Sequence, residues 1–267
     1  RRTSPLDTAS FARPLCEVRV CRPSLARNCS HHAKKNELKL WQKEQWCIPP
    51  KASAEFVCRM EDVLNTYIQP ANSQRPLVCM DEASKQLLAD KQEPLPMQPG
   101  QLERVDYEYE REGVANLFMF FAPLEGKRHL KVTDHRTRCD WAEAMRELSD
   151  VHYPDAEKIV MVLDNLNTHS SISFYEAFEP DEAQRLANRF EFHYTPKHGS
   201  WLNMAEIELS ALARQCLNGR IADKVTLAHE ALAWSEERNA QVVKVQWRFT
   251  TADARIKLKH LYPKIHV

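Results

Sequence analysis

The feature that most constrains the fold is a pair of short apolar runs, each of which ends at an aspartate. Residues 77–80 read LVCM and precede Asp81, and residues 159–163 read IVMVL and precede Asp164. Short runs without polar alternation are typical of strands that are buried on both faces of a sheet. The sequence therefore predicts two central strands, each with an aspartate at its carboxyl end.

A third acid follows on a predicted helix. After a β-rich run at 190–194, Pro196 and Gly199 indicate a turn, and apolar residues then recur at three- and four-residue steps from about residue 202. On this pattern Glu206 lies at one edge of the apolar arc and Glu208 lies on its other flank. The periodicity alone does not choose between them. With the two aspartates, either glutamate would complete a set of three carboxylates.

The remaining patterns give the order of the elements. Two further strands are expected at 114–122 and 128–132, after a polar, proline-rich excursion at 89–110. Helices are expected at 52–67, 137–152, 171–188 (broken by Pro180), 224–239 and 251–261. Three antiparallel strands followed by βα units predict an α/β protein with an RNase H-like fold. We expect a mixed five-stranded sheet with helices on both faces and a helical C-terminal tail.

Composition excludes several classes of protein. No apolar run approaches the roughly 18 residues of a membrane-spanning helix, and the first residues contain no apolar segment of the signal-peptide type. The five glycines form no phosphate-binding cluster, which argues against a P-loop or a dinucleotide-binding fold. The eight cysteines are scattered without a CxxC pair, so we expect reduced thiols rather than a disulfide framework.

The charge is distributed unevenly. The net charge of the chain is zero, with 37 basic and 37 acidic residues. Residues 1–45 contain ten Lys and Arg against four Asp and Glu, a net of +6, so residues 46–267 carry −6. Any DNA-binding face on the larger part must therefore be a local basic patch among abundant acids.

The three carboxylates indicate a metal site. Converging carboxylates repel one another unless cations neutralise them, and Mg²⁺ prefers carboxylate oxygens. A lone aspartate after a strand is commonly a turn former or a helix cap, so the pattern leaves both interpretations open. A Cys79 nucleophile assisted by His169 or His193 is a weaker alternative.

Three strings carry a family resemblance. MDEAS, VLDNLNTHS and PKHGSWLNMAEIELS resemble the three catalytic blocks of DDE-superfamily transposases, and most of all those of bacterial insertion sequences related to mariner elements. The resemblance covers roughly residues 34–262. It implies that Asp81, Asp164 and Glu206 are the catalytic and metal-binding residues, because Glu206 ends the Asn-x-x-Glu motif. It also implies a cofactor of two Mg²⁺ (or Mn²⁺) ions.

A second group of residues is expected to contact DNA. Some belong to the resembling motifs, and others surround the approach to the helix of Glu206, where packing of the turn is an equally open role. These residues are Asn165, His169, Lys197, His198, Trp201 and Asn203.

The resemblance also implies an activity and its partners. Members cleave a phosphodiester at the end of a mobile element and transfer the freed 3′-hydroxyl to target DNA, typically at a TA step. The implied partners are the terminal inverted repeats, a TA-containing target and a second copy of the chain, in a bacterial cytoplasm at the nucleoid, with no membrane. Two alternatives stay open, namely an inactive or truncated remnant that only binds DNA, and an RNase H-like nuclease without strand transfer.

The expected domain organisation has three parts. Residues 1–33 form a basic segment that is disordered or outside the family, residues 34–70 a helical linker, and residues 71–267 the catalytic domain. The family carries N-terminal helix-turn-helix modules, and 1–33 show no such pattern, so we hypothesise a frame-shifted or misannotated start. The 41 residues between Asp164 and Glu206 exceed the spacing common in mariner relatives, and the segment around Pro180 can absorb the difference.

Overall fold

The computed structural model describes residues 48–49 and 51–264. The chain divides into two units, Arg1–Pro49 and Pro50–Val267. Every helix and strand of the described residues lies in the second unit. The predictions for residues 1–33, and for 34–47 of the expected linker, lie outside the described residues.

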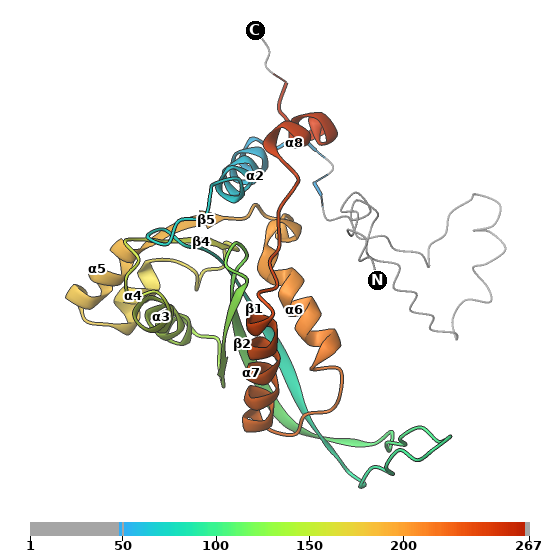
Figure 1. Ribbon diagram of the computed structural model, residues 1–267. Coiled ribbons are helices and arrows are strands. Elements are labelled where there is room, and N and C mark those ends of the chain that lie inside the picture. Colours follow the sequence, from blue (N-terminus) through green and yellow to red (C-terminus); the bar gives the residue numbers. More distant parts are fainter. Residues whose placement is uncertain (1–47, 50, 265–267) are drawn as a thin grey trace, which may run out of the picture. The chain divides into compact units, whose positions relative to one another are not determined.

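Five strands form one mixed sheet in the order β3-β2-β1-β4-β5 (Figure 1). The strands are β1 (Leu77–Asp90), β2 (Tyr109–Ala122), β3 (Lys127–Thr133), β4 (Ile159–Leu163) and β5 (Phe190–Tyr194). β1 pairs with β2 and β2 with β3 in antiparallel fashion, whereas β1 with β4 and β4 with β5 run parallel. The predicted α/β class and the antiparallel pairing of the first three strands are confirmed.

The first hairpin is longer than predicted. β1 was expected to end at residue 80, but it continues to Asp90, paired from Asp81↔Met119 to Asp90↔Tyr109 with β2. The added residues extend beyond β4, whose pairing with β1 stops at Cys79↔Val162. They were missed because most of them are partly or fully exposed, and strands without a buried face show no apolar run. Asp81 therefore lies within β1, at the point where β4 ends its pairing.

Helices cover both faces of the sheet. Figure 1 shows the group α3, α4 and α5 on one side and the pair α6 and α7 on the other. The helices are α2 (Ala54–Tyr67), α3 (Arg138–Glu147), α4 (Ile172–Ala177), α5 (Pro180–Arg189), α6 (Met204–Gln215), α7 (Lys224–Ala240) and α8 (Thr251–Lys257). Short turns of helix are η2 (Leu148–His152), η3 (Ser200–Leu202) and η4 (Lys259–Leu261). Pro180 begins α5 at its first turn, where a missing N–H costs nothing.

The apolar strand residues alternate between two cores. Val78, Met80, Phe118 and Phe120 belong to a buried cluster with Trp141 of α3. The intervening residues are buried toward the other face, where α6 lies against β1 and β2 and α7 lies against β3. Burial on both faces explains why the central strands read as continuous apolar runs.

The C-terminal segments pack against α2 and the residue before it. The Ser53 amide donates to the Leu261 carbonyl at 2.9 Å, and Arg255 pairs with Glu61 at 2.8 Å. α2, which falls within the expected linker, thus packs on the same unit as the sheet. None of the described helices combines the length and the apolar composition needed to cross a membrane.

Candidate active site

Asp81 is held at the junction between β1 and α6. Its Oδ1 accepts from the Glu82 amide at 2.8 Å, and its Oδ2 lies 3.4 Å from Nδ2 of Asn203. The Asn203 amide also donates to the Met80 carbonyl at 2.8 Å, while its Oδ1 caps α6 by accepting from the Ala205 amide at 3.1 Å. A capping residue that also bonds the neighbouring strand fixes where the helix begins. Asn203 therefore places the first turn of α6 beside Asp81.

Glu206 lies in that first turn, and Glu208 does not share its surroundings. Glu208 is only 1% exposed and is paired with Arg128 at 2.9 Å and Arg238 at 3.0 Å. A carboxylate that is buried and paired twice is not available to a ligand. Glu206 is half-buried, and the helix N-terminus favours its negative charge. Of the two glutamates that periodicity left open, the geometry favours Glu206.

Asp164 follows β4 directly, as predicted, and its side chain is 35% exposed. Its Oδ1 lies 2.5 Å from Nδ1 of His169, and Nε2 of the same imidazole lies 2.9 Å from Oε2 of Glu82. Glu82 is a site residue that the sequence analysis missed. Because side chains alternate along a strand, Glu82 faces the side opposite to Asp81. That side of the strand is where the loop carrying His169 lies.

Electrostatics show that the three predicted acids act on one another. Burial raises the pKa of Asp81 to about 7, against a hydrogen bond from the Glu82 amide, and the charges of Glu206, Asp164 and Glu82 add to the rise. Burial also raises the pKa of Glu206, where a hydrogen bond with Ser200 opposes the rise and the charge of Asp164 adds to it. The structure therefore brings Asp81, Asp164 and Glu206 into one acidic environment.

His169 carries the opposite charge. Burial disfavours its protonated ring, but hydrogen bonds with Asp164 and Glu82 outweigh burial and raise the pKa of His169 to about 9. Both ring nitrogens then act as donors at neutral pH.

A divalent cation fits this donor set. Carboxylate oxygens are the ligands that Mg²⁺ and Mn²⁺ prefer, and a bound cation would turn the mutual repulsion of the acids into attraction. Among residues 48–49 and 51–264, no three His, Cys, Asp or Glu side chains converge closely enough to hold a metal as they stand. The carboxylate oxygens of the site are suitable metal ligands, but in the structure the described side chains are not close enough together to coordinate one ion.

The residues expected to contact DNA divide into two groups. Asn165, Lys197 and His198 are exposed, and Trp201 is half-buried in a stack with Trp247 at 6.4 Å between ring centroids. Contact of these four residues with DNA stays a prediction.

Two of the residues expected to contact DNA are buried. Asn203 and His169 are each 1% exposed, and the polar atoms of both side chains bond internally. Direct DNA contact of these two residues stays a prediction, and as they are placed both side chains are enclosed by the chain. Their side chains position other groups of the site.

The alternative nucleophile, Cys79, is excluded by its surroundings. Burial raises the pKa of its thiol to about 12, and its polar neighbour is the Tyr67 hydroxyl at 3.5 Å rather than a histidine. Only a thiolate is a good nucleophile. Cys79 is a core residue.

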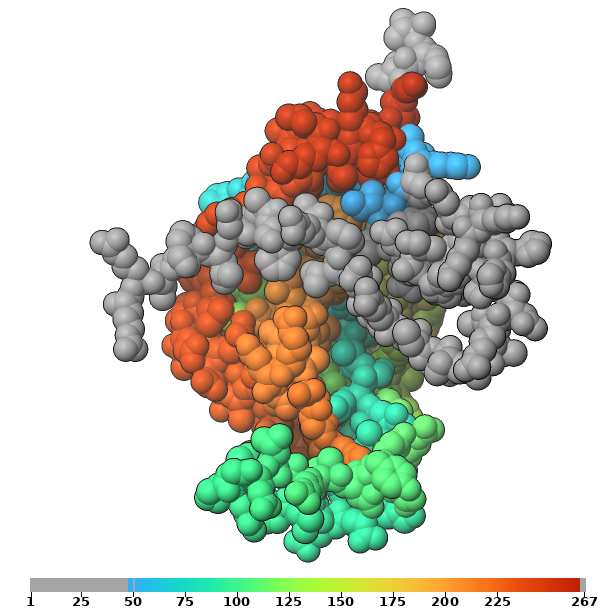
Figure 2. Space-filling view, turned by 90° about the vertical axis from the view of Figure 1, so that its right-hand side faces the viewer, coloured from blue at the N-terminus to red at the C-terminus, as the bar shows by residue number. Residues whose placement is uncertain are grey.

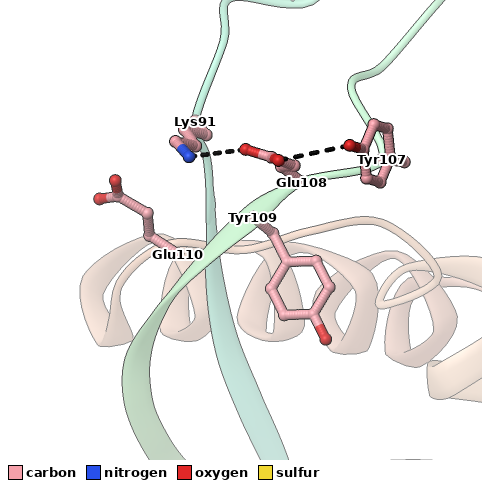
Figure 3. Close-up of a pocket in the computed structure, with 5 residues that line it drawn as sticks. All are labelled: Lys91, Tyr107, Glu108, Tyr109 and Glu110. Atoms are coloured by element: carbon pink, nitrogen blue, oxygen red, sulfur yellow. Dashed lines mark hydrogen bonds and ion pairs between the residues drawn. The ribbon is translucent and has the colours of Figure 1, made fainter.

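Two surface hollows lie away from the acids. One is formed by the long hairpin, where Lys91 pairs with Glu108 at 2.6 Å and Tyr107 bonds the same carboxylate (Figure 3). The other runs along residues 69–77 and 152–156, where β1 and β4 begin, whereas the two aspartates lie just beyond the point where the pairing of β1 with β4 stops. None of the three acids lines either hollow.

Comparisons with solved structures agree with the observed fold. The chain resembles the mariner transposase Mos1 in a paired-end complex with Mg, at 12% identity and a TM-score of 0.50, over 88% of this chain and 71% of that one. The Mos1 paired-end complex with Mn gives 15% identity and a TM-score of 0.49, over 82% and 70%. The Mos1 strand transfer complex gives 13% and 0.47, and this chain spans 65% of its length. Similarities at this level of identity show the fold alone.

Sequence comparison is more specific. No curated protein matches the chain significantly. A family model, described as DDE superfamily endonuclease, matches residues 76–228, which is more than half of the 267 residues and contains all three acids. The chain is therefore a member of the DDE superfamily of endonucleases.

Proposed function

We propose that this chain is the catalytic part of a DNA transposase, which cleaves a phosphodiester at the end of a mobile element and joins the freed 3′-hydroxyl to target DNA. The observation that carries this proposal is the shared acidic environment of Asp81, Asp164 and Glu206, inside the region that matches the endonuclease family. Carboxylates whose negative charges act on one another are suited to metal-assisted phosphoryl transfer.

Asp81, Asp164 and Glu206 would hold the metal, two Mg²⁺ or Mn²⁺ ions. When bound, such ions activate the attacking oxygen and stabilise the leaving oxygen. The protein's own contribution is to orient the ligands. Asn203 fixes α6 against β1, and the pairing of β1 with β4 brings the two aspartates to adjacent strands.

DNA is the substrate. Lys197 and His198 lie exposed in the turn before α6, and Asn165 lies exposed beside Asp164. Contacts of such side chains to phosphates would position the scissile bond without reading sequence. Recognition of terminal inverted repeats and of a TA target follows from the family resemblance of the motifs, as does an origin in a bacterial insertion sequence.

The active complex is a homodimer, in which the tip of the first hairpin contacts the second copy. Figure 2 shows this tip, residues 91–108, projecting at the lower edge beyond α6 and α7. It carries large apolar side chains that are 56–84% exposed, namely Leu95, Met97, Leu102, Val105 and Tyr107. Exposed apolar patches of this kind are typical of interaction surfaces.

The dimer is tested by ultracentrifugation in the presence of DNA. Leu102→Glu and Tyr107→Glu should shift the chain from dimer to monomer. Val225→Glu, at an apolar residue of α7 that is 76% exposed, is the matched control and should leave the dimer intact. An unchanged dimer in both tip variants would contradict this interface.

Cleavage and strand joining are tested together. The chain is incubated with DNA that carries matched terminal repeats, with Mg²⁺, with Mn²⁺ or with EDTA. Asp81→Asn, Asp164→Asn and Glu206→Gln should each abolish cleavage, whereas Asp155→Asn, at an exposed acid away from the site, should not. Cleavage without joined products would favour a nuclease without strand transfer. DNA binding without cleavage would favour a remnant.

A further inference from the structure

The imidazole of His169 connects two carboxylates that come from different parts of the fold. Nδ1 lies 2.5 Å from Oδ1 of Asp164, and Nε2 lies 2.9 Å from Oε2 of Glu82. The His169 side chain is 0% exposed and that of Glu82 is 7% exposed, whereas that of Asp164 is 35% exposed, so the connection meets solvent mainly at its Asp164 end. The contact with Glu82 crosses 87 residues of sequence.

The ring is fixed from several sides. The His169 amide donates to the Leu166 carbonyl at 3.0 Å, and the Tyr194 hydroxyl donates to the His169 carbonyl at 2.9 Å. The indole of Trp141 packs against the imidazole at 5.8 Å between ring centroids. A side chain held by its backbone, a neighbouring strand and an aromatic ring has one orientation. It can therefore impose an orientation on its partners.

We propose that His169 and Glu82 are positioning residues for Asp164. They fix the Asp164 carboxylate through its Oδ1, so that Oδ2 lies outside that bond and can act as the metal ligand. This inference rests on the proposed function, because it assigns Asp164 to the metal site. Ligating carboxylates commonly depend on such outer hydrogen bonds, and loss of an outer partner typically costs about 10- to 100-fold in metal affinity.

The two hydrogen bonds of His169 are not equivalent. The inner bond, to Asp164, is short and lies beside the acids. The outer bond is to Glu82, whose Oε1 reaches Arg136 at 3.4 Å, and Arg136 is 56% exposed. Disruption near Asp164 should therefore weaken metal binding more than disruption near Glu82.

Two amide substitutions separate the two bonds of His169. Asparagine places its amide nitrogen near the position of Nδ1, and glutamine places its own near Nε2. His169→Asn can thus keep the bond to Asp164 and lose the one to Glu82, whereas His169→Gln does the reverse. If His169 were only a structural link between β1 and its own loop, the two variants would be equivalent.

The measurement is Mn²⁺ binding to the full chain, followed by the electron paramagnetic resonance signal of free Mn²⁺, without DNA or turnover. His169→Gln should weaken Mn²⁺ affinity by about 10- to 100-fold, and His169→Asn and Glu82→Gln by less than about tenfold. Equal loss in His169→Asn and His169→Gln, or no loss in His169→Gln, would overturn the proposal.

A double variant tests whether His169 acts through Asp164. Asp164→Asn combined with His169→Gln, or with Glu82→Gln, should bind Mn²⁺ no more weakly than Asp164→Asn alone, because residues in one connection are not additive. If His169→Gln does not fold, as judged by its melting curve, the Glu82→Gln pair decides the question. Additive losses would overturn the inference.

The failure of the proposed function gives a different result. If Asp164→Asn binds Mn²⁺ as the unaltered chain does, Asp164 is not a metal ligand and the proposed site itself is wrong. If Asp164→Asn loses affinity and His169→Gln does not, the metal site stands and only the positioning role fails.

Discussion

Two carboxylates on α6, two residues apart, have opposite electrostatic surroundings. Burial and the negative charges of neighbouring acids raise the pKa values of Glu206 and Asp81. Glu208 lies between Arg128 and Arg238, fully paired. The same helix thus separates a site where carboxylates gather from a core where two arginines hold one carboxylate. The first arrangement suits a cation ligand, and the second suits stability.

One of the arginines that pair with Glu208 makes further bonds inside the core. Beside its bond to Glu208, Arg128 donates to the Gly126 carbonyl at 2.8 Å and to the Val243 carbonyl at 2.6 Å. Its guanidinium also lies over the ring of Phe121 at 4.5 Å. Buried ion pairs are favourable only when such additional bonds satisfy the remaining donors. This cluster joins β3, α6 and the segment after α7, and it fixes the helix that carries Glu206.

The largest expected effect separates the two glutamates by activity. Glu206→Gln should lower Mg²⁺-dependent DNA cleavage by about a thousandfold or more, because a lost ligand removes several kcal/mol of charge stabilisation. Glu208→Gln should retain cleavage per folded molecule. A gel assay of nicked DNA, normalised to the folded fraction, measures both. Activity that survives in Glu206→Gln and disappears in Glu208→Gln would reverse the assignment of the third acid.

The next effect separates the same residues by stability. Glu208→Gln leaves Arg128 and Arg238 without a buried countercharge, so it should lower the free energy of unfolding by about 3–5 kcal/mol. At this size that loss corresponds to roughly 6–20 °C in melting temperature. Glu206→Gln, the matched control, should change the free energy of unfolding by less than about 1 kcal/mol. Equal melting curves would show that the arginine cluster does not stabilise the unit.

A smaller effect concerns pH. The pKa of Asp81 is about 7 in the folded chain, against an ordinary value of 3.8 for aspartate. Folding therefore disfavours its charged form, and the stability contribution is full below pH 3.8 and is lost as pH rises through 7. Without divalent cations, Asp81→Asn should be more stable than the unaltered chain at pH 8 by about 1–3 kcal/mol. Urea denaturation at pH 5 and pH 8 measures this difference, which should be smaller at the lower pH. A variant less stable than the unaltered chain at pH 8 would contradict it.

The smallest expected effect on stability concerns the exposed ion pair of Arg136 with Glu82. Arg136 is 56% exposed where it reaches Glu82 at 3.4 Å. Exposed pairs contribute little, so Arg136→Ala should change the free energy of unfolding by less than about 1 kcal/mol. Arg128→Ala, which removes a buried partner of Glu208, serves as the contrast in the same thermal melts. A loss in Arg136→Ala as large as in Arg128→Ala would mean that burial does not decide the value of these pairs.

The sequence by itself determined the elements that a local pattern can encode. The apolar runs at 77–80 and 159–163 predicted the central strands, because strands buried on both faces must be apolar throughout. The β-rich run at 190–194 predicted the edge strand β5. Asp164 after β4 and the helix of Glu206 were located in the same way. Pro180 correctly separated α4 from α5.

Only the tertiary structure decided the features that depend on distant partners. The extension of β1 to Asp90 depends on pairing with β2, since its own residues are largely exposed and carry no periodic signal. The contact between Glu82 and His169 and the choice of Glu206 over Glu208 depend on where other parts of the chain come to lie. Periodicity reports which side of an element a residue faces, but not which charge the fold places there. That charge decides whether a carboxylate stabilises the core or is left for a ligand.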